Sequence, residues 1–168
     1  VGEQISVHIA RLVGRWFGVQ SETMEKALND ARAVPGRFHK EELNGILLID
    51  DSFNANPISM RRGLRRLAAI QKTGRRRVAI LGWMGELGSD ADRFHREIAP
   101  LARDAAGLVV GIGEMARLYE PDVWFPSSVE CAKSLGDIIR IGDIVFVKGS
   151  HSVELHAVTR ELKRLYAD

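Results

Sequence analysis

A run of short polar side chains stands directly after one of the apolar stretches of the sequence. It consists of Asp50, Asp51, Ser52, Phe53, Asn54, Ala55, Asn56 and Pro57. Carboxylate, hydroxyl and amide groups at this density can hydrogen-bond the hydroxyls of a ribose or the water bound to a phosphate. Asp and Asn also form turns and helix caps, so the alternative is that Asp51 or Ser52 only caps the helix that follows. Because the polar run is so long, we favour a binding function over this structural role.

A second loop could also take part in binding. The segment Leu81–Gly88 contains three glycines, which allow tight turns and a close approach of the backbone to a ligand. His95 follows this loop within an expected helix. A lone histidine more often has a structural role than a functional one, so both interpretations stay open for His95.

A third loop follows the last apolar stretch of the chain. It consists of Lys148, Gly149, Ser150, His151 and Ser152, and a helix is expected directly after it. A lysine there can bind a carboxylate or a phosphate, and the backbone N–H groups at the start of the helix favour an anion. The alternative is that Lys148 only extends from the edge of a sheet to water. We favour anion binding.

Five apolar runs have the length of buried strands, and amphipathic stretches separate them. The runs are Ile46–Ile49, Val78–Leu81, Leu108–Ile112, Val123–Phe125 and Ile144–Val147, and the expected helices lie near 58–72, 91–106, 114–119, 127–139 and 152–166. Strands that are apolar throughout and alternate with helices predict an α/β fold, a three-layer architecture whose mostly parallel sheet has helices on both faces. Ligands bind at the carboxyl ends of the strands in such sheets, so the three loops should meet at one edge.

The first 34 residues differ in pattern from the rest of the chain. Their periodicity predicts two helices, and Ser21 is the expected N-cap of the second. Pro35 and Gly36 then end helical structure. We therefore place a domain boundary between a helical segment, 1–34, and an α/β domain, 35–168. The chain does not begin with Met, which suggests that a preceding segment is missing.

Composition places the chain among soluble globular proteins. The 168 residues are 45% hydrophobic and 27% charged, which excludes the disordered, collagen-like and coiled-coil classes. Cys131 is the single cysteine and cannot form an internal disulfide, so a reducing cytoplasm is the expected location. Apolar runs of the ~18 residues needed to span a bilayer are absent from the sequence, so we expect no membrane association.

Positive charge is concentrated in one segment, although the formal net charge is only +2. The segment from Arg61 to Arg77 contains eight cations and no acid, and it could follow the phosphates of a polyanion. We favour a solvated helix face, because Leu64, Leu67 and Ala68 recur at helical spacing between the arginines. No aromatic side chains are interleaved to stack on bases, so we do not expect a nucleic-acid partner.

Several sequence motifs of catalysis are absent. The chain has neither a G-x-x-x-x-G-K-[ST] phosphate loop nor a complete G-x-G-x-x-G dinucleotide-binding pattern. It also lacks Cys and His at zinc-binding spacing and a G-x-S-x-G nucleophile motif. We therefore predict binding loops without a catalytic residue or a metal site in these 168 residues.

Four motifs together resemble those of the Mur ligases in order and in spacing. They are Pro35-Gly-Arg37, Asp50-Asp-Ser-Phe-Asn-Ala-Asn-Pro57, Leu81-Gly-Trp-Met-Gly-Glu-Leu-Gly88 with His95 beyond it, and Val147-Lys-Gly-Ser-His-Ser152. The second motif is highly specific, and the four span residues 35–152. The pattern is most similar to that of the family members that add D-alanyl-D-alanine to UDP-N-acetylmuramoyl-tripeptide in peptidoglycan precursor synthesis.

The resemblance implies one part of a larger enzyme. Mur ligases have three domains; residues 35–168 resemble the Rossmann-like C-terminal domain, and 1–34 resemble the helical end of the central ATP-binding domain. The implied reaction is ATP-dependent amide formation, in which the dipeptide amine attacks an acyl phosphate of the tripeptide. The phosphate loop and the Mg²⁺ ligands would lie upstream of Val1, so the 168 residues alone should be inactive. We expect a monomeric cytoplasmic enzyme.

The resemblance also assigns roles to individual residues. The residues that would contact the nucleotide are Arg37, Asp51, Asn54 and Asn56. The residues that would face the incoming dipeptide or the tripeptide end are Lys148 and Ser150, with His95 and His151 nearby. UDP-N-acetylmuramoyl-tripeptide and D-alanyl-D-alanine are the implied substrates, with ATP and Mg²⁺ as cofactors.

This sequence departs from the family pattern within these motifs. Trp83 replaces an acid, Gly85 stands where Leu is common, His151 replaces Arg, and Phe53 replaces Tyr. The loss of an acid and an arginine changes the charge where anions would meet. Two alternatives therefore stay open: a Mur-type ligase with a different amine acceptor, and a non-catalytic module that binds a polyanion through Arg61 to Arg77.

Overall fold

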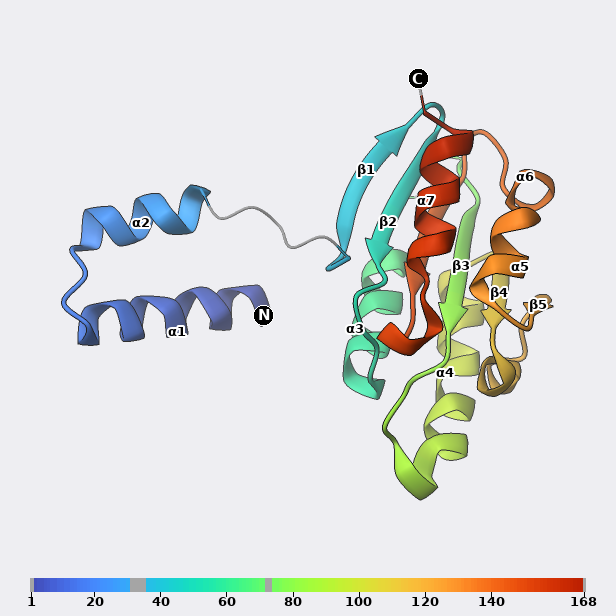
Figure 1. The fold of residues 1–168 in the computed structure, drawn as a ribbon, viewed down its shortest axis with the longest axis horizontal. Coiled ribbons are helices and arrows are strands. Elements are labelled where there is room, and N and C mark those ends of the chain that lie inside the picture. Colours follow the sequence, from blue (N-terminus) through green and yellow to red (C-terminus); the bar gives the residue numbers. More distant parts are fainter. Residues whose placement is uncertain (1, 31–35, 72–73, 168) are drawn as a thin grey trace. The chain divides into compact units, whose positions relative to one another are not determined.

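The computed structural model describes residues 2–30, 36–71 and 74–167. The chain divides into two compact units, Val1–Ala33 and Val34–Asp168, and each is described by itself (Figure 1). The predicted boundary between residues 34 and 35 falls within 31–35, outside the described residues. None of the helices in the described ranges is long and apolar enough to cross a membrane.

The first unit contains the two helices that the periodicity predicts. Helix α1 spans Gly2–Trp16 and α2 spans Ser21–Asp30. Ser21 is the first residue of α2 and not its N-cap, because the amide of Met24 donates to the carbonyl of Gln20. The predicted cap is therefore wrong by one residue, and Gln20 holds the N-cap position.

The second unit is built on a six-stranded sheet. Its strands are β1 His39–Leu43, β2 Ile46–Asp51, β3 Arg77–Gly82, β4 Leu108–Ile112, β5 Val123–Phe125 and β6 Ile144–Lys148. The order across the sheet is β1-β2-β6-β3-β4-β5, and every neighbouring pair is parallel except β1 and β2. The mostly parallel sheet predicted from the apolar runs is confirmed, and each run lies within one of the strands β2 to β6.

The helices of this unit are α3 Pro57–Ala68, α4 Ala91–Ala105, α5 Ser128–Lys133, α6 Leu135–Ile138 and α7 His156–Leu165. Short 3-10 segments lie at Gly88–Asp90, Glu114–Tyr119 and His151–Val153. The helix predicted over 58–72 ends early, at Ala68, where the guanidinium of Arg77 donates to the Ala68 carbonyl at 2.6 Å. The helix predicted over 127–139 is two helices, interrupted at Ser134.

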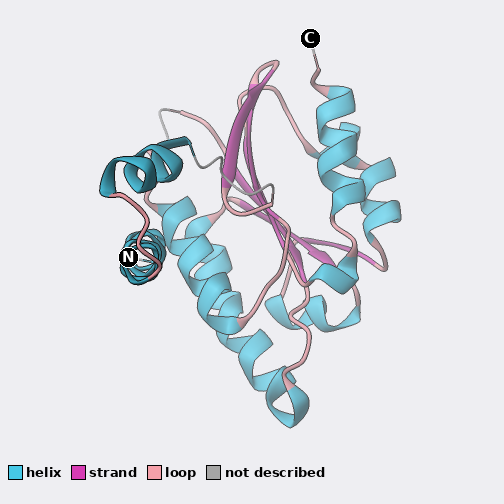
Figure 2. Cartoon of the chain, turned by 60° about the vertical axis from the view of Figure 1, so that its left-hand side comes forward, coloured by secondary structure: helices cyan, strands magenta, loops and turns pink. Residues whose placement is uncertain are grey.

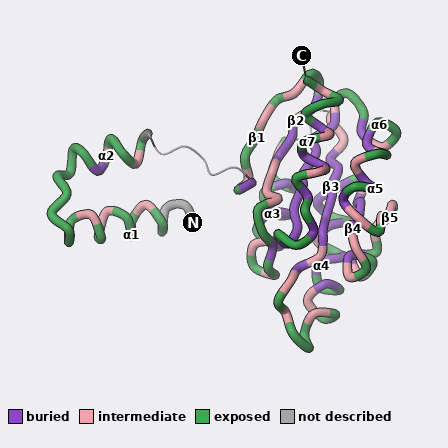
Figure 3. The backbone as a smooth tube through the Cα atoms, in the orientation of Figure 1, coloured by how far each residue is buried: buried purple, intermediate pink, exposed green. Residues whose placement is uncertain are grey.

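Helices cover both faces of the sheet, as Figure 2 shows. Helices α3 and α4 pack on the face that carries Ala79 and Leu81 of β3. Helices α5, α6 and α7 pack on the face that carries Val78 and Ile80. The side chains of β3 therefore alternate between two apolar cores, and the strand is buried along its whole length (Figure 3). The predicted three-layer α/β architecture is confirmed.

Strand β1 is not predicted by the apolar pattern. Its sequence, His39 to Leu43, is mostly polar, because β1 lies at the edge of the sheet and is largely exposed. It pairs antiparallel with β2 through the two-residue turn Asn44-Gly45, in which Gly45 has a φ of 84°. An Asn-Gly pair between two strand-length segments is a known hairpin signal, so the sequence does contain an indication of β1.

Candidate functional site

The three polar loops meet at the carboxyl edge of the sheet. Strand β2 ends at Asp51 and β6 ends at Lys148, and these two residues are direct partners in the register. On the other side of β6, Lys148 pairs with Leu81 of β3, from which the glycine-containing loop continues. The parallel register therefore brings Asp51, Lys148 and the loop after β3 to the same level, as expected for an α/β sheet.

Lys148 is buried beneath the loop that follows β2. Its side chain is 2% exposed, and its ammonium group lies 2.9 Å from Oδ2 of Asp51. The same group donates to the backbone carbonyl of Asn54, also at 2.9 Å. Burial lowers the pKa of Lys148, and the carboxylate of Asp51 opposes this shift. Lys148 therefore does not extend to water, and it holds Asp51 and the Asn54 backbone together.

The second carboxylate oxygen of Asp51 fixes the segment that enters the domain. Oδ1 accepts a hydrogen bond from the amide of Phe38 at 3.0 Å. Phe38 has a φ of 52° and Gly36 has a φ of 73°, so two left-handed residues flank Arg37. A left-handed non-glycine residue costs about 1 kcal/mol, which the Asp51 hydrogen bond and the packing of the Phe38 ring on Phe146 offset. The segment 36–38 is therefore held against the sheet edge.

A cavity of about 300 Å³ opens at this place. Residues that line it are Gly36, Arg37, Phe38, Asp51, Phe53, Asn54, Ala55, Asn56, Ser59, Arg62, Gly63, Arg66 and Lys148. We call it the first cavity. Three arginines and Lys148 contribute positive charge to its walls, and Asp51 contributes the negative charge. All four residues predicted to contact a nucleotide line this cavity, and its charge suits an anionic ligand.

Asn56 lines the first cavity and also caps the helix that follows the polar loop. Asn56 is the N-cap of α3: its Oδ1 accepts from the amide of Ser59 at 2.8 Å, and the Ser59 hydroxyl accepts from the Asn56 amide. This capping box satisfies two amides at the start of the helix, and Pro57 occupies the first helical turn. The helix cap is therefore Asn56, and the alternative that Asp51 or Ser52 caps α3 is wrong.

A second cavity, of about 250 Å³, adjoins the first. It is lined by Gly36, Asp50, Ser52, Phe53, His151, Glu154, Leu155, His156 and Thr159. Gly36 and Phe53 line both cavities. The centre of the Phe53 ring lies 4.6 Å from the guanidinium carbon of Arg37 and 6.3 Å from the centre of the His151 ring. Phe53 therefore connects a wall of the first cavity with a wall of the second.

The structure does not bring together all the residues predicted to face the incoming dipeptide or the tripeptide end. His151 lines the second cavity and is exposed. Lys148 lines the first cavity, with the residues predicted to contact a nucleotide. Ser150 is 8% exposed, its amide donates to the carbonyl of Trp83, and it is not among the residues that line either cavity.

His95 is fully buried and supports the loop after β3 from below. Its Nε2 accepts from the amide of Met84 at 2.9 Å, and its Nδ1 is 2.6 Å from the carbonyl of Ala91. The ring stacks on Tyr119, whose hydroxyl donates to the carbonyl of Gly82. Both ring nitrogens have partners within the protein, which favours the structural interpretation of His95 over the predicted place near a substrate.

The buried imidazole should make stability depend on pH. Burial lowers the pKa of His95 in the folded protein, so the unfolded chain binds a proton more readily once the pH falls below about 6.5. We expect the free energy of unfolding to decrease as the pH is lowered through this range, and His95→Gln to reduce the decrease. Guanidinium chloride denaturation at pH 7.5 and 5.5 measures both values, with His39→Gln on exposed β1 as the matched control. Equal pH dependence in the parent chain and in His95→Gln would contradict the assignment.

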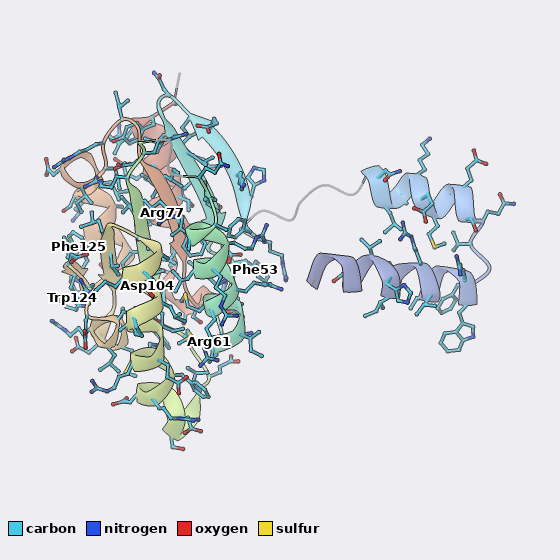
Figure 4. The ribbon with its side chains drawn as sticks, turned by 180° about the vertical axis from the view of Figure 1, so that it is seen from behind. Phe53, Arg61, Arg77, Asp104, Trp124 and Phe125 are labelled. Carbon is cyan, nitrogen blue, oxygen red and sulfur yellow. The ribbon has the colours of Figure 1, made fainter. Side chains whose placement is uncertain are left out.

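The basic segment from Arg61 to Arg77 does not form a single face. Arg61 pairs with Glu97, whereas Arg76 pairs with Asp143 at 2.6 Å. Arg77 is 8% exposed and donates to carbonyls at the end of α3. Figure 4 shows Arg61 and Arg77 at different places on the domain. The segment is therefore divided between α3 and the start of β3, and several of its cations are used within the fold.

The described residues contain no cluster of three or more His, Cys, Asp or Glu side chains that could hold a metal ion. Sequence reasoning missed several residues of the first cavity, among them Phe38, Arg62 and Arg66. The two arginines stand four residues apart on a helix that begins directly after the polar loop, so helical spacing could have placed them on the face toward that loop.

Comparison with known proteins identifies a family that this chain matches. Residues 36–151 match the family model described as Mur ligase, glutamate ligase domain. The UDP-N-acetylmuramoyl-tripeptide--D-alanyl-D-alanine ligase of Mycobacterium leprae is 35% identical over an alignment 178 residues long, gaps included, that covers 89% of this chain and 34% of that protein.

Solved structures agree with this match. The crystal structure of MurF ligase from Thermotoga maritima in complex with ADP has a TM-score of 0.74 and 25% identity, over 91% of this chain and 36% of that one. A crystal structure of MurF from Acinetobacter baumannii has a TM-score of 0.76 and 25% identity, over 88% and 35%. The chain thus spans about a third of the length of these relatives. Because the family model matches well over half of its residues, this chain belongs to the Mur ligase family, with the fold of the C-terminal domain.

Proposed function

We propose that this chain is the C-terminal substrate-binding domain of an ATP-dependent, amide-forming ligase. The observation that carries the proposal is the pair of adjoining cavities that share Phe53. One has cationic walls suited to a nucleotide, and the other contains the carboxylates of Asp50 and Glu154, suited to an amine. Relatives named as D-alanyl-D-alanine ligases support the finer proposal that the enzyme adds this dipeptide to UDP-N-acetylmuramoyl-tripeptide in peptidoglycan precursor synthesis.

The first cavity would hold the nucleotide. We propose that Arg37 contacts its anionic part, while Asp51 and the amides of Asn54 and Asn56 contact its sugar. When bound, ATP supplies the phosphoryl group that activates the carboxylate of the tripeptide substrate for attack by the dipeptide amine. The contribution of this chain is positioning and charge stabilisation, because its residues hold several anionic groups together and exclude water from them.

The second cavity would hold the incoming amine. Its two carboxylates can orient the ammonium group of a dipeptide, and His151 lies at the same cavity. Lys148 takes a different role from the one predicted, because it is buried on the side of the first cavity. We propose that Lys148 positions Asp51 and the Asn54 backbone. Ser150, whose amide donates to the carbonyl of Trp83 in the loop after β3, keeps its predicted role as a residue of the acceptor side.

Departures from the family pattern bear on the identity of the acceptor. Trp83 is half-buried and packs against the core beneath α5 to α7, and it is not among the residues that line either cavity. His151 lines the second cavity and stands where the family pattern has an arginine, so this departure changes the charge of the cavity wall directly. A Mur-type ligase with a different amine acceptor is therefore the alternative. The division of the segment Arg61 to Arg77 favours neither a polyanion-binding module nor a nucleic-acid partner.

The rest of the enzyme would supply the remaining parts of the active site. We propose that residues 1–34 are the helical end of the preceding ATP-binding central domain, and that 35–168 form the C-terminal domain. Mg²⁺ would accompany ATP, with its ligands on the central domain, so the 168 residues alone should show no ATP turnover. We further propose a monomeric enzyme that works in the cytoplasm.

A ligase assay tests this proposal on the complete product of the gene that encodes this chain. The assay contains ATP, UDP-N-acetylmuramoyl-tripeptide and D-alanyl-D-alanine, and in parallel other dipeptides and single amino acids. We expect amide product and ADP in equal amounts with D-alanyl-D-alanine. Product from another amine alone would replace the acceptor and keep the ligase class. No ADP release with any acceptor would contradict the proposal.

A further inference from the structure

Two arginines of α3 have no assigned role although both line the first cavity. Arg62 and Arg66 stand four residues apart, which places them one above the other on the same face of the helix. Arg61 and Arg65 stand on the same helix but do not line this cavity. Two of the four arginines of α3 are therefore directed toward the polar loops.

Close packing of α3 on the sheet edge brings these arginines to the site. Gly63 lies so near the buried ion pair that a Cβ there would be 3.4 Å from Oδ2 of Asp51 and 3.4 Å from Cδ of Lys148. Arg62 is the neighbour of Gly63, and its charge lowers the pKa of Lys148 through electrostatic repulsion. The close approach of α3 at Gly63 therefore brings Arg62 to the wall of the cavity.

Arg66 is held in place by an aromatic ring. Its guanidinium carbon lies 3.5 Å from the centre of the Phe38 ring, and that ring packs on Phe146 of the core. In the described part of the chain, Arg62 and Arg66 form no ion pair with an acidic side chain, whereas Arg61 pairs with Glu97. The two cavity arginines therefore keep their hydrogen-bonding groups available for a ligand.

Positive charge in the first cavity exceeds what its own carboxylate can neutralise. Arg37, Arg62, Arg66 and Lys148 face Asp51 alone, and Asp51 is already engaged by Lys148 and by the amide of Phe38. Three guanidinium groups remain. Guanidinium groups bind phosphate oxygens in a bidentate manner, and a chain of phosphates carries the several negative charges needed to balance them, whereas a single carboxylate does not.

We propose that Arg62 and Arg66, together with Arg37, bind the phosphate chain of the nucleotide in the first cavity. The inference rests on the proposed function in so far as the ligand is a nucleotide. It adds a phosphate-binding wall on α3, outside the four motifs of the sequence. In this arrangement Asp51 and the asparagines contact the sugar, and α3 contacts the phosphates.

Arg65 provides a matched control on the same helix. Arg65 is exposed and lines a more open hollow on the outer side of α3, together with Ile58, Arg61 and Ala69. Arg62 and Arg66 line this outer hollow as well as the first cavity. A substitution at Arg65 changes the net charge of α3 by the same amount as one at Arg62. Only the first cavity distinguishes them, so a difference between the two variants reports on that cavity and not on overall charge.

Isothermal titration calorimetry of the 168-residue chain tests the proposal with ADP, adenosine and sodium tripolyphosphate at low ionic strength. We expect Arg62→Gln and Arg66→Gln each to weaken ADP and tripolyphosphate about five- to tenfold, because each loses a charge-assisted contact. Adenosine should bind the variants and the parent chain equally. Arg65→Gln should stay within about twofold of the parent chain for every ligand. Thermal unfolding confirms that each variant is folded.

Three results would overturn the proposal. They are unchanged ADP and tripolyphosphate affinity in both cavity variants, an equal loss in Arg65→Gln, and no heat of tripolyphosphate binding by the parent chain at millimolar concentration. The ligase assay described above is independent of these titrations. Ligase activity without the arginine effect would reject the phosphate wall alone, whereas the arginine effect without ligase activity would reject the proposed reaction alone.

Discussion

Replacing Lys148 with methionine is expected to lower the free energy of unfolding by about 3 kcal/mol, because removing one partner of a buried ion pair leaves the other uncompensated. The side chain of Lys148 is 2% exposed and that of Asp51 is 17% exposed, so water can hydrate the remaining carboxylate only in part. The carbonyl of Asn54 also loses its donor. Methionine keeps most of the volume, so the loss reports on charge and hydrogen bonds. Chemical denaturation measures it.

Lys163→Met is the matched control for this substitution. Lys163 forms an ion pair with Glu41 in which the two side chains are 46% and 34% exposed, and such surface pairs contribute less than about 1 kcal/mol. The double variant Asp51→Asn with Lys148→Met should recover at least about 1 kcal/mol relative to the sum of the single variants, because the two residues contact each other. A loss below about 1 kcal/mol in Lys148→Met would show that the pair does not hold the loop.

Gly149→Ala is expected to cost about 3 kcal/mol, at the upper end for overpacking, since the added methyl group meets backbone that cannot move aside. A Cβ at Gly149 would lie 2.8 Å from Cα of Gly82 and 2.7 Å from Cδ1 of Leu155. The contact with Gly82 joins the ends of β6 and β3, so the substitution should separate the two strands where they position the site. The melting temperature and the affinity for ADP should both fall.

Gly136→Ala serves as the comparison for this second prediction. Gly136 lies in α6. A Cβ there would have no heavy atom within 4 Å other than those of its two chain neighbours and of the helix's own backbone. Alanine favours helix over glycine by up to about 1 kcal/mol, so this variant should be neutral or slightly stabilised. Equal effects of the two substitutions would mean that the close approach of β6 to β3 does not constrain residue 149.

The fold was predictable where burial determines residue type. Strands β3 and β6 lie within the sheet and are buried along their whole length, so most of their positions select an apolar side chain and the runs stand out in the sequence. Strand β1 lies at an edge, where one face and one side stay in contact with water, so the sequence His39 to Leu43 shows no apolar run. The end of α3 depends on a contact from Arg77, which is distant in sequence and leaves no local signal.

The site was predictable in its location but not in its detailed contacts. The rule that loops gather at the carboxyl ends of parallel strands brought Asp51, Asn54 and Lys148 together in prediction and in structure alike. Which way a side chain turns at that edge depends on its partners. Lys148 turns inward to Asp51, and His95 turns inward to the amide of Met84, and neither partner could be inferred from spacing.

Backbone amide chemical-shift mapping by NMR tests the central claim most directly, with ADP titrated into the isotope-labelled 168-residue chain. We expect the largest shifts at Arg37, Asp51, Asn54 and Arg62, around the first cavity. Shifts concentrated on α5 to α7, or no shifts at millimolar ADP, would contradict the claim that the carboxyl edge of this sheet is the nucleotide-binding half of a ligase site.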